Sequence, residues 1–175
     1  MAANFDFKAL LYNFSIMLLF YKLYNNRMKY YSYENFKVDT NALIKKVESL
    51  HFEAIVAIAR GGLTLSHAMA EGLDIRQVQS IRTELYDKSL KREEITISGK
   101  CEFKNVKRVL VIDDISDSGD TLSAVMKYLQ EEHKEIEFKS ATLFYKKTSI
   151  YEPHFWINEA DDWIDFFWER DYKRD

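Results

Sequence analysis

Two acidic residues stand side by side in the segment VLVIDDISDSGDTL, residues 109–122. The four apolar residues before them are typical of a buried strand, whereas Asp113 and Asp114 repel each other unless a ligand or water accommodates their charge. A short loop of small and acidic residues follows, and a helical pattern begins near Leu122. We therefore expect a strand, a tight loop and a helix, with a polar site where the strand ends.

A strand–loop–helix junction can hold a phosphate, because backbone N–H groups and the positive end of the helix dipole point at one place. Residues 117–121 suit this role, since Gly119 permits close approach and the hydroxyls of Ser118 and Thr121 can donate. The two carboxylates would repel a phosphate, but they suit sugar hydroxyls or a divalent metal beside it. A phosphate next to a diol describes a ribose 5-phosphate, which is the ligand this segment predicts.

Other polar residues follow apolar runs in the same way. The run AIVAIA, residues 54–59, leads into Arg60, and the run at residues 140–145 leads into Lys146. In open parallel sheets, ligands bind beyond the carboxyl ends of the strands. Arg60, Lys146 and the acidic pair are therefore expected at one edge of a sheet.

The remaining pattern predicts an α/β domain with a mostly parallel sheet flanked by helices. A helix is expected to begin at a cap, Asp39 or Thr40, and another to stop at Gly72. A further strand is expected at residues 77–81, and residues 85–107 are charged and weakly patterned. The helical apolar positions that support the first helix are Leu43, Ile44, Val47 and Leu50.

The composition excludes several classes of protein. The chain has 175 residues and a net charge of -3, which suits one globular domain and gives no basic field for nucleic acid. The single cysteine, Cys101, excludes an intrachain disulfide framework and a multi-cysteine metal site. We expect an inert thiol and a reducing, cytoplasmic compartment.

Residues 1–27 are expected to be an extension of a domain that spans residues 28–175. Residues 9–24 are apolar, but Asn13, Ser15 and Lys22 interrupt them, so they fall short of the ~18 apolar residues of a spanning helix. No integral membrane span is expected. An amphipathic helix, a true start at Met28 and binding at a membrane interface stay open as alternatives.

The segment VLVIDDISDSGDT resembles, at every position, the signature of type I phosphoribosyltransferases. The loop AIARGGL, residues 57–63, is similar to the pyrophosphate loop of bacterial xanthine-guanine phosphoribosyltransferases, with Ala59 where a small residue such as serine is usual. LFYKK, residues 143–147, and DDWIDFFWE, residues 161–169, resemble the base-binding parts of that family. The resemblance runs in order from Met28 and implies the type I fold with a small C-terminal hood segment.

The resemblance implies transfer of a phosphoribosyl group from 5-phosphoribosyl-1-pyrophosphate to guanine, xanthine or hypoxanthine in purine salvage, with Mg²⁺ and in a homodimer or homotetramer. Asp117 is implied as the acid or base at the purine N7, Asp114 as a metal ligand, and the Ala59–Arg60 peptide bond as cis. The donor site implied in this way comprises Arg60, Gly61, Asp113, Asp114, Ser116, Asp117, Ser118, Gly119, Asp120 and Thr121.

For the base, the resemblance implies that Lys146 donates to the 6-oxo group, Trp163 stacks, and the Ile164 carbonyl accepts from a 2-amino group. A shift by one residue to Lys147 stays open. The segment 86–92 matches a mobile catalytic loop, in which Lys91 or Arg92 is a candidate for a pyrophosphate contact. The other C-terminal aromatic residues are expected to be packing: Trp156, Phe166, Phe167 and Trp168.

Two alternatives to a purine enzyme remain at this point: a non-catalytic regulator with the same fold, or an enzyme with another base acceptor. The negative net charge and the presence of Asp117, Lys146 and Trp163 favour an enzyme. The aromatic pair Phe166 and Phe167, where the family tends to be more polar, leaves the choice of base open.

Overall fold

The computed structural model describes residues 29–86 and 94–173, which form two compact units. The larger unit spans Tyr33–Asp161, and the smaller one joins residues 29–32 to residues 162–173. The predicted extension, residues 1–27, and the loop residues Lys91 and Arg92 lie outside the described residues. Within the described ranges, no helix is both long and apolar enough to span a membrane.

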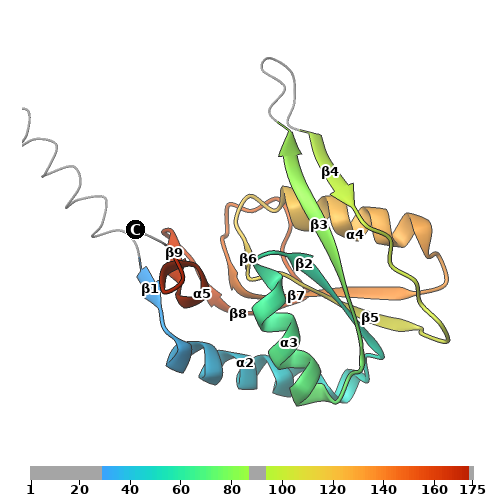
Figure 1. Ribbon diagram of the computed structural model, residues 1–175, viewed down its shortest axis with the longest axis horizontal. Coiled ribbons are helices and arrows are strands. Elements are labelled where there is room, and N and C mark those ends of the chain that lie inside the picture. Colours follow the sequence, from blue (N-terminus) through green and yellow to red (C-terminus); the bar gives the residue numbers. More distant parts are fainter. Residues whose placement is uncertain (1–28, 87–93, 174–175) are drawn as a thin grey trace, which may run out of the picture. The chain divides into compact units, whose positions relative to one another are not determined.

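A mostly parallel sheet forms the centre of the larger unit, as the sequence predicts (Figure 1). Its strands lie in the order β4-β3-β2-β5-β7-β6, and β8 pairs with β7. Every neighbouring pair is parallel except β3 and β4. The strands are β2 (Ala54–Ala59), β3 (Gln77–Tyr86), β4 (Glu94–Ser98), β5 (Arg108–Ile112), β6 (Ile115–Ser116), β7 (Glu137–Tyr145) and β8 (Phe155–Glu159).

The central strands are apolar on both faces because helices cover both. Helix α4 (Asp120–Glu132) lies behind the strands in Figure 1, and helix α3 (Gly62–Leu73) lies in front. The buried face of α4 joins alternate residues of β2 and β5 in one apolar cluster. Its members include Ala54, Val56, Ile58, Val109, Val111, Leu122, Val125 and Leu129. This packing fixes where β5 ends and α4 begins.

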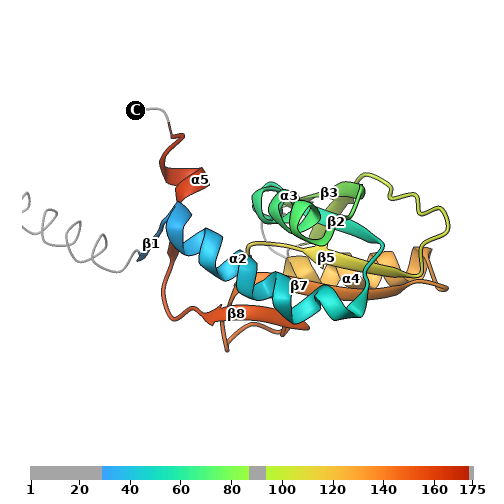
Figure 2. The same cartoon turned by 90° about the horizontal axis from the view of Figure 1, so that it is seen from below.

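Helix α2 (Tyr33–Val47) begins earlier than expected, so the prediction of a cap at Asp39 or Thr40 is wrong. Its buried stripe starts at Phe36 and continues through Thr40, which extends the helical periodicity back toward the N-terminus. Asp39 instead accepts a hydrogen bond from the Asn158 side chain at 2.7 Å. A short 3₁₀ turn, η1 (Glu48–Leu50), follows α2, which packs against α3 and β8 (Figure 2).

Gly72 does not stop α3, because the helix continues to Leu73 and Asp74 takes the left-handed conformation, with φ 51°. A Cβ atom on Gly72 would lie 2.3 Å from Cδ1 of Ile44 in α2. The glycine therefore permits close approach of two helices, which explains a residue that is otherwise unfavourable inside a helix.

Strand β3 runs to Tyr86, beyond the predicted end at residue 81, because the unpredicted strand β4 pairs with its second half. The β4 sequence EITIS carries only two strongly apolar residues, which is typical of an edge strand. Cys101 follows this strand and is buried. Burial raises the pKa of its thiol to about 11, in keeping with the inert thiol that we expected.

In the smaller unit, β1 (Lys29–Tyr31) pairs in parallel with β9 (Ile164–Phe166), and α5 (Phe167–Arg170) follows. The Phe166 and Trp168 rings stack at 4.6 Å, and Tyr31 packs edge-on against both. Phe166, Phe167 and Trp168 are therefore packing residues, as predicted. Trp156, in the larger unit, packs against Tyr145 at 5.3 Å.

The close approach of α2 and α3 predicts energetic coupling between Gly72 and Ile44. Alanine is preferred over glycine inside a helix by about 1 kcal/mol, but overpacking typically costs about 1–3 kcal/mol. We expect Gly72→Ala to be less favourable in the natural chain than beside Ile44→Val, which removes Cδ1. Urea unfolding of both single variants and the double variant measures this coupling. Strictly additive free energies of unfolding would contradict the packing role of Gly72.

Candidate functional site

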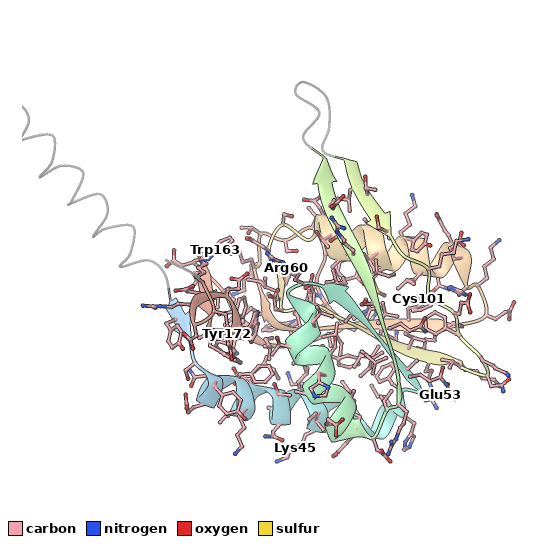
Figure 3. The ribbon with its side chains drawn as sticks, viewed as in Figure 1. Lys45, Glu53, Arg60, Cys101, Trp163 and Tyr172 are labelled. Carbon is pink, nitrogen blue, oxygen red and sulfur yellow. The ribbon has the colours of Figure 1, made fainter. Side chains whose placement is uncertain are left out.

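Three parallel strands end at one edge of the sheet and place the predicted polar residues there. Ala57 of β2 lies opposite Ile112 of β5, and Ile112 lies opposite Ala141 of β7. Arg60 follows β2 directly, at the opposite end of that strand from Glu53 (Figure 3). The acidic pair follows β5, and Lys146 follows β7.

The loop after β2 lies directly on the loop after β5 because two glycines leave room for it. A Cβ atom on Gly61 would lie 2.3 Å from Oδ2 of Asp114, and one on Gly62 would lie 2.3 Å from the carbonyl oxygen of Ile112. The Ala59–Arg60 peptide bond is cis, as the resemblance implies. The Arg60 side chain is exposed and makes no ion pair with any other described residue. Arg60 therefore directly precedes the glycines that pack on the acidic pair, and its charge is open to solvent.

The Asp113 carboxylate lies in surroundings that disfavour its charge. Burial, followed by the nearby charge of Asp114, raises the pKa of Asp113 well above its usual range. The N–H groups of Asp114, at 3.0 Å, and of Gly62 donate to the Asp113 carboxylate and offset part of this effect. Asp114 is itself buried. Hydroxyl groups or a cation arriving at this place would stabilise the ionised pair.

The acidic pair would fit a magnesium ion that takes most of its ligands from water or phosphate oxygens. Among the residues that the structure describes, no group of three or more His, Cys, Asp or Glu side chains could enclose a metal ion. Mg²⁺ keeps most of its ligands as water or phosphate oxygens and needs only one or two carboxylates from the protein. Asp113 and Asp114 supply that number of carboxylates.

The loop between β5 and α4 has the shape expected of a phosphate site. Gly119 has φ 88°, a conformation that favours glycine, and α4 begins at Asp120 without a side-chain cap. Ser118 is exposed and accepts a hydrogen bond from the Asp120 N–H at 3.4 Å, and Thr121 is half-buried in the first turn. The start of α4 is thus not covered by a cap of its own.

Ser116 differs from the other predicted phosphate ligands. Its side chain is buried, donates to the Tyr151 carbonyl oxygen at 2.8 Å and lies 2.9 Å from the Ser149 hydroxyl. The fold already uses this hydroxyl, so the prediction that it binds a phosphate is not supported by its position.

An ion pair connects the end of β7 to the predicted phosphate loop, residues 117–121. Nζ of Lys146 lies 2.7 Å from Oδ1 of Asp117, and the side chains are 20% and 46% exposed. The next residue points elsewhere, since Lys147 pairs with Glu159 at 2.7 Å and that hydrogen bond raises the pKa of Lys147. Of the two lysines that the sequence left open, Lys146 is therefore the one that contacts a predicted site residue.

Trp163 and Ile164 belong to the smaller unit. The Trp163 side chain is 58% exposed, and its carbonyl oxygen accepts a hydrogen bond from the Lys29 N–H at 3.2 Å. Ile164 is buried in β9. An exposed indole beside a packed aromatic cluster is compatible with a stacking surface for a planar ring.

Sequence reasoning assigned no role to residues 148–151, which follow the two lysines. In the structure, the Ser149 hydroxyl lies 2.9 Å from the Ser116 hydroxyl, and the Tyr151 carbonyl oxygen accepts from Ser116 at 2.8 Å. No motif marks these residues, because the contacts join segments that are far apart in the chain.

The phosphoribosyl transferase domain profile matches residues 29–175. The solved xanthine-guanine-hypoxanthine phosphoribosyltransferase of Helicobacter pylori is 39% identical, with a TM-score of 0.78, and the match covers 82% of this chain and 95% of that one. The purine phosphoribosyltransferase of Pyrococcus horikoshii is 25% identical, with a TM-score of 0.74, over 85% of this chain and 99% of that one.

A curated xanthine-guanine phosphoribosyltransferase from Nitratidesulfovibrio vulgaris is 32% identical over 149 residues, which are 79% of this chain and 82% of that protein. The profile match contains both glycine-dependent loops, the acidic pair and the lysine at the end of β7. The chain therefore belongs to the phosphoribosyltransferase family of enzymes and has its type I fold.

Proposed function

We propose that the protein transfers the 5-phosphoribosyl group from 5-phosphoribosyl-1-pyrophosphate to a 6-oxopurine, giving a nucleoside monophosphate and pyrophosphate in purine salvage. The substrates in the names of its relatives support guanine, xanthine or hypoxanthine as the base. The observation that carries the proposal is the 2.7 Å contact between Lys146 and Asp117. It puts a hydrogen-bond donor and an acceptor side by side, next to the phosphate loop.

A 6-oxopurine presents O6 and N7 on the same edge of the ring. The Lys146 ammonium can only donate, so it matches the O6 carbonyl, and the Asp117 carboxylate can accept a proton from N7. Adenine has an amino group in place of the carbonyl, so it would leave two donors facing each other. The pair therefore favours 6-oxopurines over adenine.

The donor is proposed to occupy the remainder of the edge. Arg60 and the N–H groups of the adjoining glycine loop bind the pyrophosphate, and residues 117–121 bind the 5-phosphate through N–H groups and the Ser118 and Thr121 hydroxyls. Asp113 and Asp114 accept hydrogen bonds from the ribose hydroxyls. Lys147, held by Glu159, takes no part.

In the reaction, the bond from the ribose C1 to pyrophosphate breaks as a purine nitrogen bonds to that carbon. Positive charge develops on the ribose, where the acidic pair stabilises it, and Asp117 accepts the proton that the base gives up. Mg²⁺, held in part by Asp114, would neutralise charge on the leaving pyrophosphate when bound. We further propose that the chain forms a homodimer or homotetramer, as the family resemblance implies. A cytoplasmic location is proposed from the single cysteine.

The two neighbouring lysines provide a matched test. We expect Lys146→Met to lower kcat/KM with 6-oxopurines by about 10–200-fold, the equivalent of one charged hydrogen bond. Lys147→Met should change it by less than a few-fold, because its exposed pair with Glu159 lies outside the proposed site. Initial rates with guanine, xanthine, hypoxanthine and adenine measure both variants, and the natural chain should use adenine poorly.

Calorimetric titration with the phosphoribosyl donor separates binding from base recognition. Donor affinity of Lys146→Met should stay within a few-fold of the natural chain. A larger effect at Lys147, or loss of donor binding in Lys146→Met, would show that the base is read elsewhere. Tight donor binding without turnover of any base would support a regulator in place of an enzyme.

Asp117→Asn is expected to reduce kcat by about 10²–10⁴-fold, since asparagine cannot accept the purine proton. The amide is nearly isosteric, so the phosphate loop should keep its shape and the donor should bind with similar affinity. Steady-state kinetics and donor titration decide the matter together. A near-normal kcat in Asp117→Asn would contradict the role of Asp117 as proton acceptor and leave it only the ion pair with Lys146.

Asp113→Asn should stabilise the ligand-free protein at neutral pH while weakening donor binding. Because the pKa of Asp113 is raised in the folded state, its ionisation opposes folding once the pH exceeds the ordinary carboxyl pKa, ~3.9. We expect a higher Tm for the variant at pH 7 and a vanishing difference near pH ~3, where both forms are neutral. Thermal unfolding at several pH values measures this, and a lower Tm at pH 7 would contradict it.

A further inference from the structure

The segment that follows β7, residues 146–151, is bonded to the phosphate loop at several points. The Lys146 N–H donates to the Ser116 carbonyl oxygen at 3.1 Å, and the Ile150 N–H donates to the Ser118 carbonyl oxygen at 2.8 Å. The Lys146 carbonyl oxygen accepts from the Ser149 N–H at 2.9 Å. The backbone of Lys146 is therefore held on one side by the phosphate loop and on the other by Ser149.

The Ser149 hydroxyl is the centre of these contacts. It lies 2.9 Å from the Ser116 hydroxyl and 3.0 Å from the Tyr151 carbonyl oxygen, and it accepts from the Tyr151 N–H at 3.3 Å. The Ser116 hydroxyl lies 2.8 Å from the same carbonyl oxygen. Each serine has one hydroxyl proton. One of these two protons is donated to the Tyr151 carbonyl oxygen, and the other is donated to the oxygen of the neighbouring serine. Neither hydroxyl has a proton to spare.

Gly119 lets the loop before α4 pack closely against Ser149 and Tyr151. A Cβ atom on Gly119 would lie 2.3 Å from the Ser149 hydroxyl oxygen and 2.6 Å from the Tyr151 nitrogen. The glycine of the phosphate loop is thus packed against Ser149, and a shift of one segment requires a shift of the other. This is a second reason for glycine at position 119, in addition to its φ of 88°.

We propose that Ser149 is a positioning residue for base recognition, which sets the place of Lys146 relative to a phosphate bound in the loop. The inference rests on the proposed function, since it assigns the base to Lys146 and the 5-phosphate to residues 117–121. Ser149 touches neither substrate. Its N–H group holds the Lys146 carbonyl oxygen, and its hydroxyl holds the segment to Ser116. A displacement of about 1 Å can be costly in a site that depends on geometry.

The donor site should not depend on Ser149 to the same degree. The phosphate loop is also held by α4, where the Ser123 N–H donates to the Gly119 carbonyl oxygen at 2.9 Å. Ser116 keeps its contacts with Lys146 and Tyr151 when the Ser149 hydroxyl is removed. Loss of Ser149 is therefore expected to disturb base use more than donor binding.

Ser149→Ala tests the inference, with Thr148→Ala as the matched control. Thr148 is the exposed neighbour and has no hydrogen bond among those of the described residues, so its variant removes a hydroxyl without touching the phosphate loop. In the ligand-free protein, amide hydrogen exchange at residues 149 and 150 should be faster in Ser149→Ala and unchanged in Thr148→Ala. Ser149→Cys, of similar size, guards against a folding defect and should shift exchange in the same direction.

Kinetics then test the consequence for the reaction. We expect Ser149→Ala to raise the KM for the 6-oxopurine by about 3–10-fold, as for one lost hydrogen bond, while the donor Kd and the Tm stay near those of Thr148→Ala. Unchanged base kinetics in Ser149→Ala, or a donor Kd that rises as much as the base KM, would overturn the role of Ser149. Neither result would contradict the proposed function. A natural chain that uses no 6-oxopurine would overturn the proposed function and, with it, this inference.

Discussion

The repulsion between Asp113 and Asp114 is the constraint on which the remainder of the site depends. Folding places both carboxylates at the end of a buried strand, and burial together with their mutual charge raises the pKa of Asp113. Such a pair destabilises a protein that has no ligand to offset it. Gly61 and Gly62 let the loop after β2 pack on the end of β5 without the bulk of a side chain, and the Gly62 N–H donates to the Asp113 carboxylate. In the proposed function, the ligand that offsets this cost carries hydroxyl groups and negative charge together.

The parallel sheet places three loops from separate parts of the chain at one edge. Arg60 comes from the end of β2, the acidic pair and the phosphate loop from the end of β5, and Lys146 from the end of β7. The ion pair between Lys146 and Asp117 then links the last two. Since Ser149 ties the same two loops through hydrogen bonds, the groups proposed to hold the phosphate and the base form one connected unit.

Sequence reasoning succeeded where the signal was local. The apolar runs located β2, β5 and β7, and the polar residues after them lie where parallel topology puts them. It failed where tertiary contacts decide: Gly72 is explained by Ile44 of another helix, and β3 is long because β4 pairs with it. The same holds for the site, since the buried hydroxyl of Ser116 and the contacts of Ser149 join distant segments and leave no pattern in the chain.

A crystal structure with guanosine 5-monophosphate bound tests the central claim most directly, because one molecule carries the phosphate, the ribose and the 6-oxopurine. We expect the phosphate against residues 117–121, the ribose hydroxyls on Asp113 and Asp114, and the Lys146 ammonium within hydrogen-bond distance of O6. This claim would be contradicted by a nucleotide whose purine O6 is bound by Lys147 or by no lysine, or whose phosphate lies away from the start of α4.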